Sequence, residues 1–317
     1  MALKTQLEQV NCHVCGSDNT TILFEGEDLW FKRPGRFPVC VCQVCGLIYL
    51  NPRPHRDAIG AYYPDSYQPY KIATEDIESP TQRWEQAYSI QKRVNVIQKH
   101  CPNPGTVLDV GCATGNMLAA LRDVGWQPTG VEMNPTASAY ARERHQLDVF
   151  TGELNEAAFE NGRFDLVIFW DVLEHVFEPK ETLQEAARIA KSEATLILTL
   201  PNPESIDAKL FGSSWGGWDT PRHLQIFPKA VVNRLLNETG WEMENLICMT
   251  GRHWLFNLSL QHWLEQRVDS KKVRQFILSI TRSTIFRAIT LPYFILVEKL
   301  KRGSVMVIFA RRKVNPE

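Results

Sequence analysis

The chain has 317 residues, 44% of them hydrophobic and 22% charged, which is enough to bury a substantial core. Its 35 Lys and Arg residues are balanced by 36 Asp and Glu residues, so the formal net charge is −1. A near-neutral chain lacks the basic surface on which nucleic-acid binding depends. We therefore expect a soluble globular protein with no nucleic-acid partner.

The sequence also argues against export and against a membrane span. No apolar segment follows Met1, and eight cysteines in a chain of this length are more typical of thiols or metal ligands than of disulfides. The longest apolar run, residues 288–297, is far shorter than the ~20 residues of a spanning helix. We expect a cytoplasmic protein with no transmembrane segment, in which this run packs on its own domain or forms a surface for lipid or another subunit.

Two CxxC motifs, "CHVC" and "CQVC", mark residues 1–55 as a zinc-ribbon-like module. Four thiolates at this spacing can close a tetrahedral site, which stabilises a segment too short to form its own core. The predicted zinc ligands are Cys12, Cys15, Cys42 and Cys45. Cys40 is a surplus thiol close to the second motif. Buried cysteines without metal are the alternative, and a redox pair is disfavoured because neither motif lies between a strand and a helix.

Residues 56–104 are predicted to form a linker and a capping helix. Four tyrosines without helical spacing, Tyr62, Tyr63, Tyr67 and Tyr70, indicate a loop. This loop either packs the zinc module onto the main domain or covers a ligand pocket. The helix is expected over residues 82–100, where "CPNPG" ends it.

From residue 105 to 317, strand-like and helix-like segments alternate. Apolar runs at 106–110, 128–133, 164–170 and 194–200 are separated by helical patterns, which predicts an α/β, doubly wound and mostly parallel sheet. Two late strands, 241–250 and 304–312, enclose a mostly helical insertion at about 254–302.

A glycine-bearing turn, "VLDVGCATG", follows the first of these strands. Gly111 and Gly115 let the backbone approach a ligand, and the helix after the turn directs free amide groups at the same spot. The third glycine of a dinucleotide fingerprint is missing, whereas Glu132, at the end of the next strand, can accept both hydroxyls of a ribose. Asp109 would repel a pyrophosphate and favour a ligand that carries an ammonium or sulfonium group.

Four motifs in order, "VLDVGCATG", "VEMN", "GEL" and "FDLVIFWDVLEHV", resemble those of class I S-adenosylmethionine-dependent methyltransferases. The resemblance implies a seven-stranded sheet with a reversed last strand and S-adenosylmethionine as cofactor. It implies that Asp109, Gly111 and Gly115 hold the methionine part, Glu132 the ribose, and Met133 and Leu154 the adenine. Cys112, Glu153 and Trp170 are the other expected cofactor-binding residues. Another nucleotide-binding Rossmann protein is the alternative.

The head together with "PNP" and "SWGGWDTPRHLQIF" resembles a bacterial subgroup of small-molecule methyltransferases, many of them associated with glycans or secondary metabolites. This resemblance implies methylation of a small acceptor, most simply O-methylation of a sugar or secondary-metabolite hydroxyl. An RNA-modifying enzyme that grips nucleic acid with the zinc module, and a scaffold that binds cofactor without turnover, are the alternatives. The sequence makes no prediction of the oligomeric state.

Polar side chains after the fourth and fifth strands are expected to converge at one edge of the sheet. His175 and His223 are the candidate bases for removing a hydroxyl proton, and the alternative is that they only brace loops. "DVLEH" also resembles the "ExxEH" of small-RNA 2′-O-methyltransferases and quinone-biosynthesis O-methyltransferases. That resemblance implies a divalent metal at Asp171, Glu174 and His175, although Asp171 is one methylene shorter than the usual glutamate. Trp215 and Trp218 either stack on a substrate ring or pin a loop.

Overall fold

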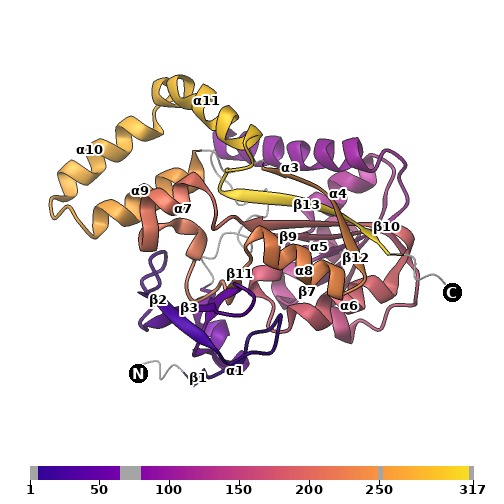
Figure 1. Ribbon diagram of the computed structural model, residues 1–317. Helices are drawn as coiled ribbons and strands as arrows, with labels where there is room; N and C mark the ends of the chain where they lie inside the picture. The colour runs from indigo at the N-terminus through magenta and orange to yellow at the C-terminus, as the bar shows by residue number, and fades with distance from the viewer. Residues whose placement is uncertain (1–5, 65–79, 249–252, 314–317) are drawn as a thin grey trace.

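A seven-stranded sheet with helices on both faces forms the body of the protein (Figure 1). The computed structural model describes residues 6–64, 80–248 and 253–313. The strand order is β12-β13-β10-β9-β6-β7-β8, and β13 runs antiparallel to both of its neighbours while the other pairs are parallel. The strands are β6 (Thr106–Val110), β7 (Gln127–Glu132), β8 (Asp148–Thr151), β9 (Phe164–Trp170), β10 (Ala190–Pro201), β12 (Trp241–Cys248) and β13 (Val305–Arg312). The predicted doubly wound sheet with a reversed last strand is confirmed.

Both faces of this sheet are buried, which explains why its strands are continuous apolar runs rather than alternating ones. Leu108, Val167 and Leu198 share one core with helices α6 and α8, whereas Val107 and Ile168 on the other face share a second core with α3, α4 and α5. The helices of the body are α3 (Pro80–His100), α4 (Asn116–Asp123), α5 (Pro135–His145), α6 (Pro179–Ile189), α7 (Ile206–Phe211) and α8 (Lys229–Glu238). Short 3₁₀ helices lie at Gly60–Tyr62, Leu154–Glu156, Leu173–His175, Gly212–Ser214 and Gly216–Trp218.

The N-terminal head shares its sheet with the body. Its elements are β1 (Leu7–Glu8), β2 (Thr20–Gly26), β3 (Phe37–Cys42), β4 (Ile48–Leu50), β5 (Arg53–Pro54) and α1 (Arg56–Ile59). Strand β11 (Gln225–Ile226), which follows the fifth strand of the body, pairs antiparallel with β4. The Leu50 amide also donates to the Leu224 carbonyl at 2.9 Å. Hydrogen bonds of the head's sheet therefore connect the head to the body. The domain boundary near residue 55 stays a prediction.

A fully buried arginine ties the head to the body a second time. Arg222, 0% exposed, donates through Nη2 to Asp28 Oδ1 at 2.9 Å and through Nη1 to Asp28 Oδ2 at 3.1 Å. Its Nε donates to Asp219, and its Nη1 also donates to the Tyr62 carbonyl. The guanidinium is thus fully paired, as a buried charge must be.

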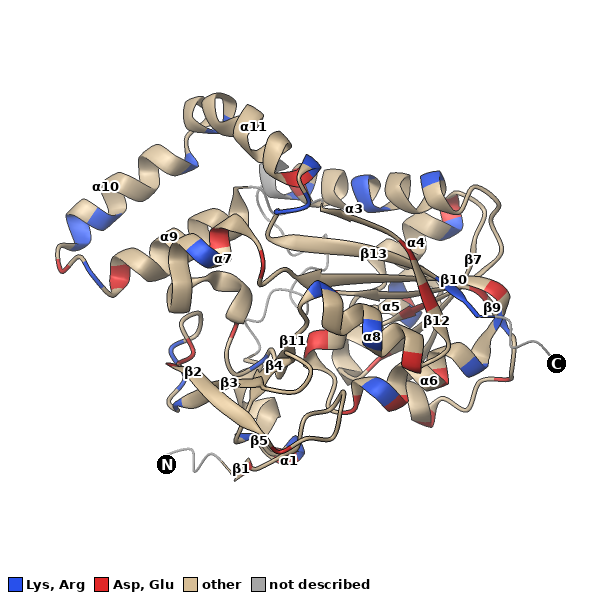
Figure 2. Cartoon of the chain, viewed as in Figure 1, with Lys and Arg blue, Asp and Glu red and all other residues tan. Residues whose placement is uncertain are grey.

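The helical insertion lies between the last two strands, as predicted. It consists of α9 (Trp254–Glu265), α10 (Lys271–Arg282) and α11 (Thr284–Lys299). In Figure 1, α10 and α11 project from the body, and Figure 2 shows Lys and Arg but no Asp or Glu along α10. Among the described residues no single helix is long and apolar enough to span a membrane, while α10 and α11, bent by 64°, pass together by length and composition.

Candidate active site

The cofactor-binding residues predicted from the sequence gather at the carboxyl edge of the parallel strands. Gly111 and Gly115, at φ values of 74° and 77°, adopt the left-handed conformation that favours glycine. A Cβ on Gly111 would lie 2.6 Å from Val172, and one on Gly115 would lie 2.7 Å from Leu147. The packing of the turn against the rest of the protein therefore requires glycine at both positions, whether or not a ligand is bound. The N-cap residue of α4 is Gly115, which has no side chain to cap the helix, and the N-terminal end of the helix faces the turn.

Glu132 joins the end of β7 to the glycine turn. Its Oε2 accepts from the Ala113 amide at 2.9 Å, and its Oε1 accepts from the Asn134 amide at 2.7 Å. Burial raises the pKa of this carboxyl, and the backbone donors oppose that shift. Each carboxylate oxygen can accept more than one hydrogen bond, so Glu132 keeps acceptor capacity on the ligand side.

Asp109 is a buried carboxyl whose Oδ1 has no hydrogen-bond partner among the described residues. Burial raises the pKa of Asp109 to about 8, and the charge of Arg93 opposes the rise. An unsatisfied buried carboxyl is costly, and such groups are concentrated at functional sites. The residue thus offers an acceptor for a ligand donor or cation.

Glu174, His175 and His223 form a cluster beyond the fourth and fifth strands. One ligand atom from each of them lies within 4.8 Å of the others, and the two imidazole rings meet edge to face with centroids 4.7 Å apart. The Nδ1 of His175 lies 2.9 Å from the Arg222 carbonyl, and that of His223 lies 2.9 Å from the Gly217 carbonyl. Since a carbonyl only accepts, these bonds assign the proton to each Nδ1 and leave a lone pair on each Nε2.

Burial sets the charge state of this cluster. It lowers the pKa of His175 to about 3 and also lowers the pKa of His223. It raises the pKa of Glu174 well above its ordinary value, and the neighbouring Asp171 adds to that rise. Both imidazoles are therefore neutral at pH 7, and Glu174 Oε2 has no partner among the described residues. The cluster can accept a proton or hold a cation.

Asp171 lies outside this cluster. Its Oδ1 accepts from the Thr199 hydroxyl at 2.7 Å, and the same hydroxyl oxygen accepts from the Asp171 amide at 2.7 Å. Of the three residues expected to hold a divalent metal, Glu174 and His175 come together with His223 instead of Asp171. Thr199 was not among the residues singled out from the sequence. The sequence feature that could have indicated Thr199 is that it is a polar residue within the otherwise apolar fifth strand.

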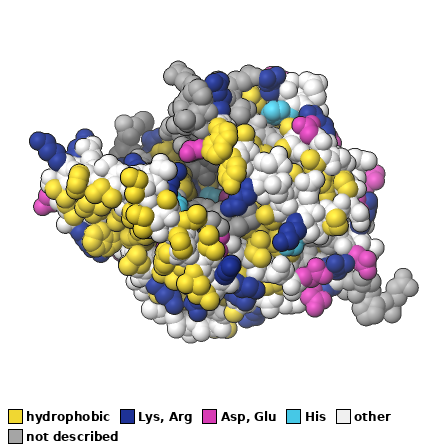
Figure 3. All heavy atoms as spheres, turned by 90° about the horizontal axis from the view of Figure 1, so that it is seen from above, with side chains coloured by type: hydrophobic (Ala, Val, Ile, Leu, Met, Phe, Trp, Pro, Cys, Tyr) yellow, Lys and Arg dark blue, Asp and Glu magenta, His cyan; other side chains and the backbone are white. Residues whose placement is uncertain are grey.

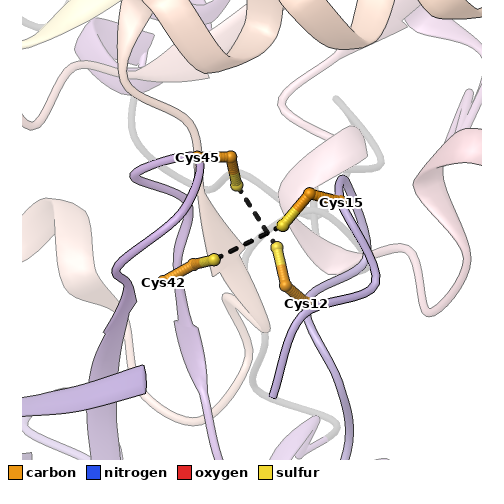
Figure 4. A group of neighbouring side chains, drawn as sticks. All are labelled: Cys12, Cys15, Cys42 and Cys45. Carbon is orange, nitrogen blue, oxygen red and sulfur yellow. Dashed lines mark hydrogen bonds between the residues drawn. The ribbon is translucent and has the colours of Figure 1, made fainter. Parts of the chain in front are cut away.

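The four cysteines of the two CxxC motifs converge in the head (Figure 4). The Sγ atoms of Cys12 and Cys45 are 3.4 Å apart, those of Cys15 and Cys42 are 3.5 Å apart, and all four lie within 4.8 Å of one another. Tetrahedral zinc with bonds of about 2.3 Å needs sulfur–sulfur separations of about 3.8 Å, which these positions approach. Cys40 points elsewhere, and its thiol lies 3.4 Å from the Asn51 carbonyl. The donor set fits zinc.

Comparison with known proteins places the chain in a family. The family model described as methyltransferase domain matches residues 82–246, more than half of the chain. The chain belongs to this methyltransferase family. The matched part contains the glycine turn, Glu132 and the cluster of Glu174, His175 and His223.

Individual relatives are distant. The methyltransferase is 24% identical over 160 residues to a protein of Mycolicibacterium smegmatis named as a probable S-adenosylmethionine-dependent methyltransferase, covering 49% of this chain and 59% of that protein. It thus spans less than two thirds of that relative. It is 28% identical over 172 residues to a ubiquinone biosynthesis O-methyltransferase of Pseudomonas paraeruginosa, covering 50% of this chain and 74% of that one.

Among solved structures, the methyltransferase is similar to magnesium protoporphyrin IX methyltransferase from Synechocystis PCC 6803 with bound S-adenosylmethionine. The TM-score is 0.47 at 14% identity, over 80% of this chain and 94% of that one. The family and the names of the sequence relatives support an S-adenosylmethionine-dependent methyltransferase.

The remaining residues predicted to bind cofactor differ in their placement. Met133 is 64% exposed beside the end of β7, and Trp170 lies buried beneath the Arg93 guanidinium, 4.9 Å from the ring. Leu154 is buried in the core with α6 and α8. Cys112 is also buried, and a Cβ on Gly130 would meet its Sγ at 2.6 Å, so its side chain fills the core behind the turn.

Glu153 already has partners within the protein. It caps the short 3₁₀ helix that follows it and forms an ion pair with Arg56 from the head side of the chain. The contacts of Arg93 and Arg56 could not be predicted from the sequence, because each residue lies on a helix that is distant along the chain from the motif that it contacts.

The aromatic residues singled out from the sequence mostly shape the site. Trp215 is buried, and Trp218 donates through Nε1 to the Gly212 carbonyl at 2.8 Å, so both hold the loop that carries Gly217. The Tyr63 hydroxyl lies 3.0 Å from His175 Nδ1, which places the start of the tyrosine segment over the histidines. Tyr67 and Tyr70 lie outside the described residues.

Asp109 gives a pH-dependent prediction for the methyltransferase without ligand. With a pKa of about 8 in the folded state against an ordinary 3.8, the folded protein binds more protons than the unfolded one between these values. The contribution of this carboxyl to stability therefore falls as the pH rises from about 4 to about 8. An amide side chain does not titrate. We therefore expect the free energy of unfolding of Asp109→Asn, relative to that of wild type, to increase by on the order of 2–4 kcal/mol as the pH rises from 5 to 8. Thermal unfolding across this range measures the gain, and a difference independent of pH would contradict it.

Proposed function

We propose that this methyltransferase transfers a methyl group from S-adenosylmethionine to a hydroxyl of a small molecule, most simply a sugar or a secondary metabolite. The observation that carries the proposal is the buried Oδ1 of Asp109 beside the glycine turn, which has no hydrogen-bond partner in the described ranges, with Glu132 at the end of the neighbouring strand. A ligand with an ammonium group and a ribose satisfies both carboxyls at once.

The side chains around the turn fit S-adenosylmethionine part by part. Asp109 would receive the ammonium of the methionine part, which removes the cost of its burial. The two oxygens of Glu132 would accept the ribose hydroxyls, and the exposed Met133 side chain next to it would cover the adenine. Leu154 and Glu153 would contribute through the backbone of their turn, since their side chains are otherwise engaged. When bound, the cofactor supplies an activated methyl group on a sulfonium.

The role proposed for His223 and His175 is to take the proton of the acceptor hydroxyl. Each has its Nδ1 proton anchored on a backbone carbonyl, so each Nε2 is fixed in direction and free of a proton. Burial lowers the pKa of both histidines, so both rings are neutral at pH 7 and each Nε2 has a lone pair on the acceptor side. The name of the Pseudomonas relative, an O-methyltransferase, supports an oxygen acceptor.

A divalent cation on the same cluster is the second candidate role. Two imidazole nitrogens and one carboxylate are a donor set that such cations accept. Oε2 of Glu174, which no described residue contacts by a hydrogen bond, would then gain a partner. A cation held by Glu174, His175 and His223 would orient the acceptor hydroxyl and ease its deprotonation. Chelation separates the two roles, as described in the Discussion.

We propose that the head binds one structural zinc through Cys12, Cys15, Cys42 and Cys45. Four thiolates leave no open position for a substrate, so the metal acts on folding alone. None of the eight cysteines, all of which lie in the described ranges, forms a disulfide, which suits a reducing compartment and supports a cytoplasmic location. The balanced charge of the chain supports a small acceptor rather than RNA.

Isothermal titration with S-adenosylmethionine and its demethylated product tests the cofactor assignment. We expect measurable heat for both, and we expect Asp109→Ala and Glu132→Ala each to weaken binding by about 1–3 kcal/mol because a charged hydrogen-bond partner is lost. Asp123→Ala, an exposed carboxyl at the end of α4, is the matched control and should bind as wild type. Heat for NAD but none for the methyl donor would contradict the assignment. Binding without turnover on a panel of sugar and phenolic hydroxyls would favour a scaffold.

A further inference from the structure

The paired helices α10 and α11 expose a continuous apolar face. Val273, Phe276 and Ile280 recur at helical spacing on α10, and Ile285, Ile289 and Leu296 do so along α11, with Leu300 at its C-cap; their exposed fractions range from 46% to 74%. The opposite face packs inward through Leu278, Thr281, Phe294 and Val297. Large exposed apolar patches mark sites of contact with a partner or a membrane. Figure 3 shows hydrophobic side chains gathered over this part of the molecule, with Lys and Arg at the edges.

The charge of the same segment sets it apart from the rest of the chain. Between residues 271 and 302 Glu298 is the one acidic residue, whereas the whole chain has a net charge of −1. The basic residues of the segment are eight, namely Lys271, Lys272, Arg274, Arg282, Arg287, Lys299, Lys301 and Arg302. An apolar stripe flanked by lysines and arginines complements a surface that is apolar beneath and negatively charged at its boundary.

Exposed aromatic rings also lie on α3, close to α11. Trp84 and Tyr88, 66% and 59% exposed, stack with ring centroids 5.3 Å apart. The guanidinium of Arg287 lies 4.0 Å from the Glu85 carboxylate, which places this end of α3 beside α11. Trp and Tyr are enriched where an apolar phase meets water, because their rings are apolar and their N–H and O–H groups are polar.

We propose that α10 and α11, with Trp84 and Tyr88, form a docking surface for an anionic lipid bilayer. The helices lie on the bilayer rather than cross it: they comprise 12 and 16 residues, and each keeps one face packed on the protein. The apolar stripe enters the boundary between headgroups and acyl chains, and the basic side chains contact the anionic headgroups. The inference does not depend on the identity of the methyl acceptor.

Vesicle co-sedimentation of the full-length protein tests the proposal. Wild type is expected to bind vesicles of equimolar phosphatidylcholine and phosphatidylglycerol, to release as salt is raised, and to bind pure phosphatidylcholine far more weakly. Ile285→Ser/Ile289→Ser should lower the partition coefficient by about tenfold or more, since two exposed apolar side chains are lost. Lys271→Gln/Lys272→Gln should lower it by about tenfold on the anionic vesicles alone.

Matched controls use residues of similar exposure elsewhere. Ile22→Ser/Leu23→Ser on β2 removes exposed apolar side chains, and Arg36→Gln/Lys99→Gln removes exposed charges; both should bind as wild type. Unchanged melting temperatures would show that each variant is folded. Equal binding by all variants, or no binding by wild type, would overturn the proposal. A second outcome would also overturn it: wild type forms a dimer in the absence of lipid, Ile285→Ser/Ile289→Ser dissociates that dimer, and no vesicle binding is seen. The surface would then bind a second copy of the chain.

Discussion

The Cys42→Ser variant is expected to purify without zinc, whereas Cys40→Ser should retain one zinc per chain. Cys42 contributes one of four sulfur atoms that converge in the head, and the Cys40 thiol faces the Asn51 carbonyl instead. A structural zinc contributes about 10–16 kcal/mol to folding in isolated zinc-finger peptides. The loss here should be smaller, several kcal/mol, because β11 and Arg222 also hold the head in place.

Elemental analysis and thermal unfolding measure the two consequences of losing the ligand. We expect Cys12→Ser, Cys15→Ser and Cys45→Ser to behave like Cys42→Ser, with Cys101→Ser, a cysteine of the body, as a further control. Loss of metal in Cys40→Ser together with its retention in Cys42→Ser would show that the ligand set has been assigned wrongly. If the wild-type protein contained no metal after expression in zinc-supplemented medium, the four cysteines would be buried thiols without a metal.

His223→Ala and His175→Ala are expected to lower turnover by a factor of about 10² to 10⁴, the usual contribution of a positioned base. The affinity for S-adenosylmethionine should remain nearly unchanged, because the proposed mechanism assigns both side chains to the acceptor rather than to the cofactor. The control is His100→Ala, whose ring stacks on Phe309 at 3.7 Å away from the cluster. Stopped-flow or steady-state turnover on the acceptor, with titration of cofactor, separates the two effects.

Chelation distinguishes a base from a bound cation. If Glu174, His175 and His223 hold a cation, EDTA abolishes turnover, Mg²⁺ or Mn²⁺ restores it, and Glu174→Gln is as damaging as either histidine variant. A base that works alone is indifferent to EDTA under conditions in which elemental analysis shows that the zinc of the head is retained. Full turnover in both alanine variants would instead mean that the histidines only brace the loops.

The sequence predicted the body of this protein well because its strands are apolar runs bounded by turns, and buried parallel strands have that pattern. The cysteine spacing likewise indicated which four thiols meet. Glu174, His175 and His223 meet at the edge of the sheet where the strand pattern predicted that they would. The sequence could not show that His223 rather than Asp171 completes the cluster, because side-chain contacts between loops follow no periodic pattern. Asp171 is instead bonded to Thr199, through a hydroxyl on the neighbouring strand.

Contacts between the head and the body lay beyond the reach of sequence reasoning. Arg222 and Asp28 are separated by 194 positions, and β11 has only two residues, too few for any period to be recognised. The burial of Leu154, which the family motif assigns to the adenine, likewise depends on the neighbouring α6 rather than on its own turn.

The pairing of Arg222 with Asp28 constrains how such a chain can be inherited. A recombination event between residues 64 and 105 that joined this body to a foreign head would keep Asp219 but remove Asp28 from the buried guanidinium. Two charged hydrogen bonds would be lost, at about 1.5–3 kcal/mol each, which is a large part of the stability of an ordinary domain. The foreign head would also need an edge strand to match β11. Descendants of this protein should therefore keep their two ends together, and a lineage that lost Asp28 should also have replaced Arg222.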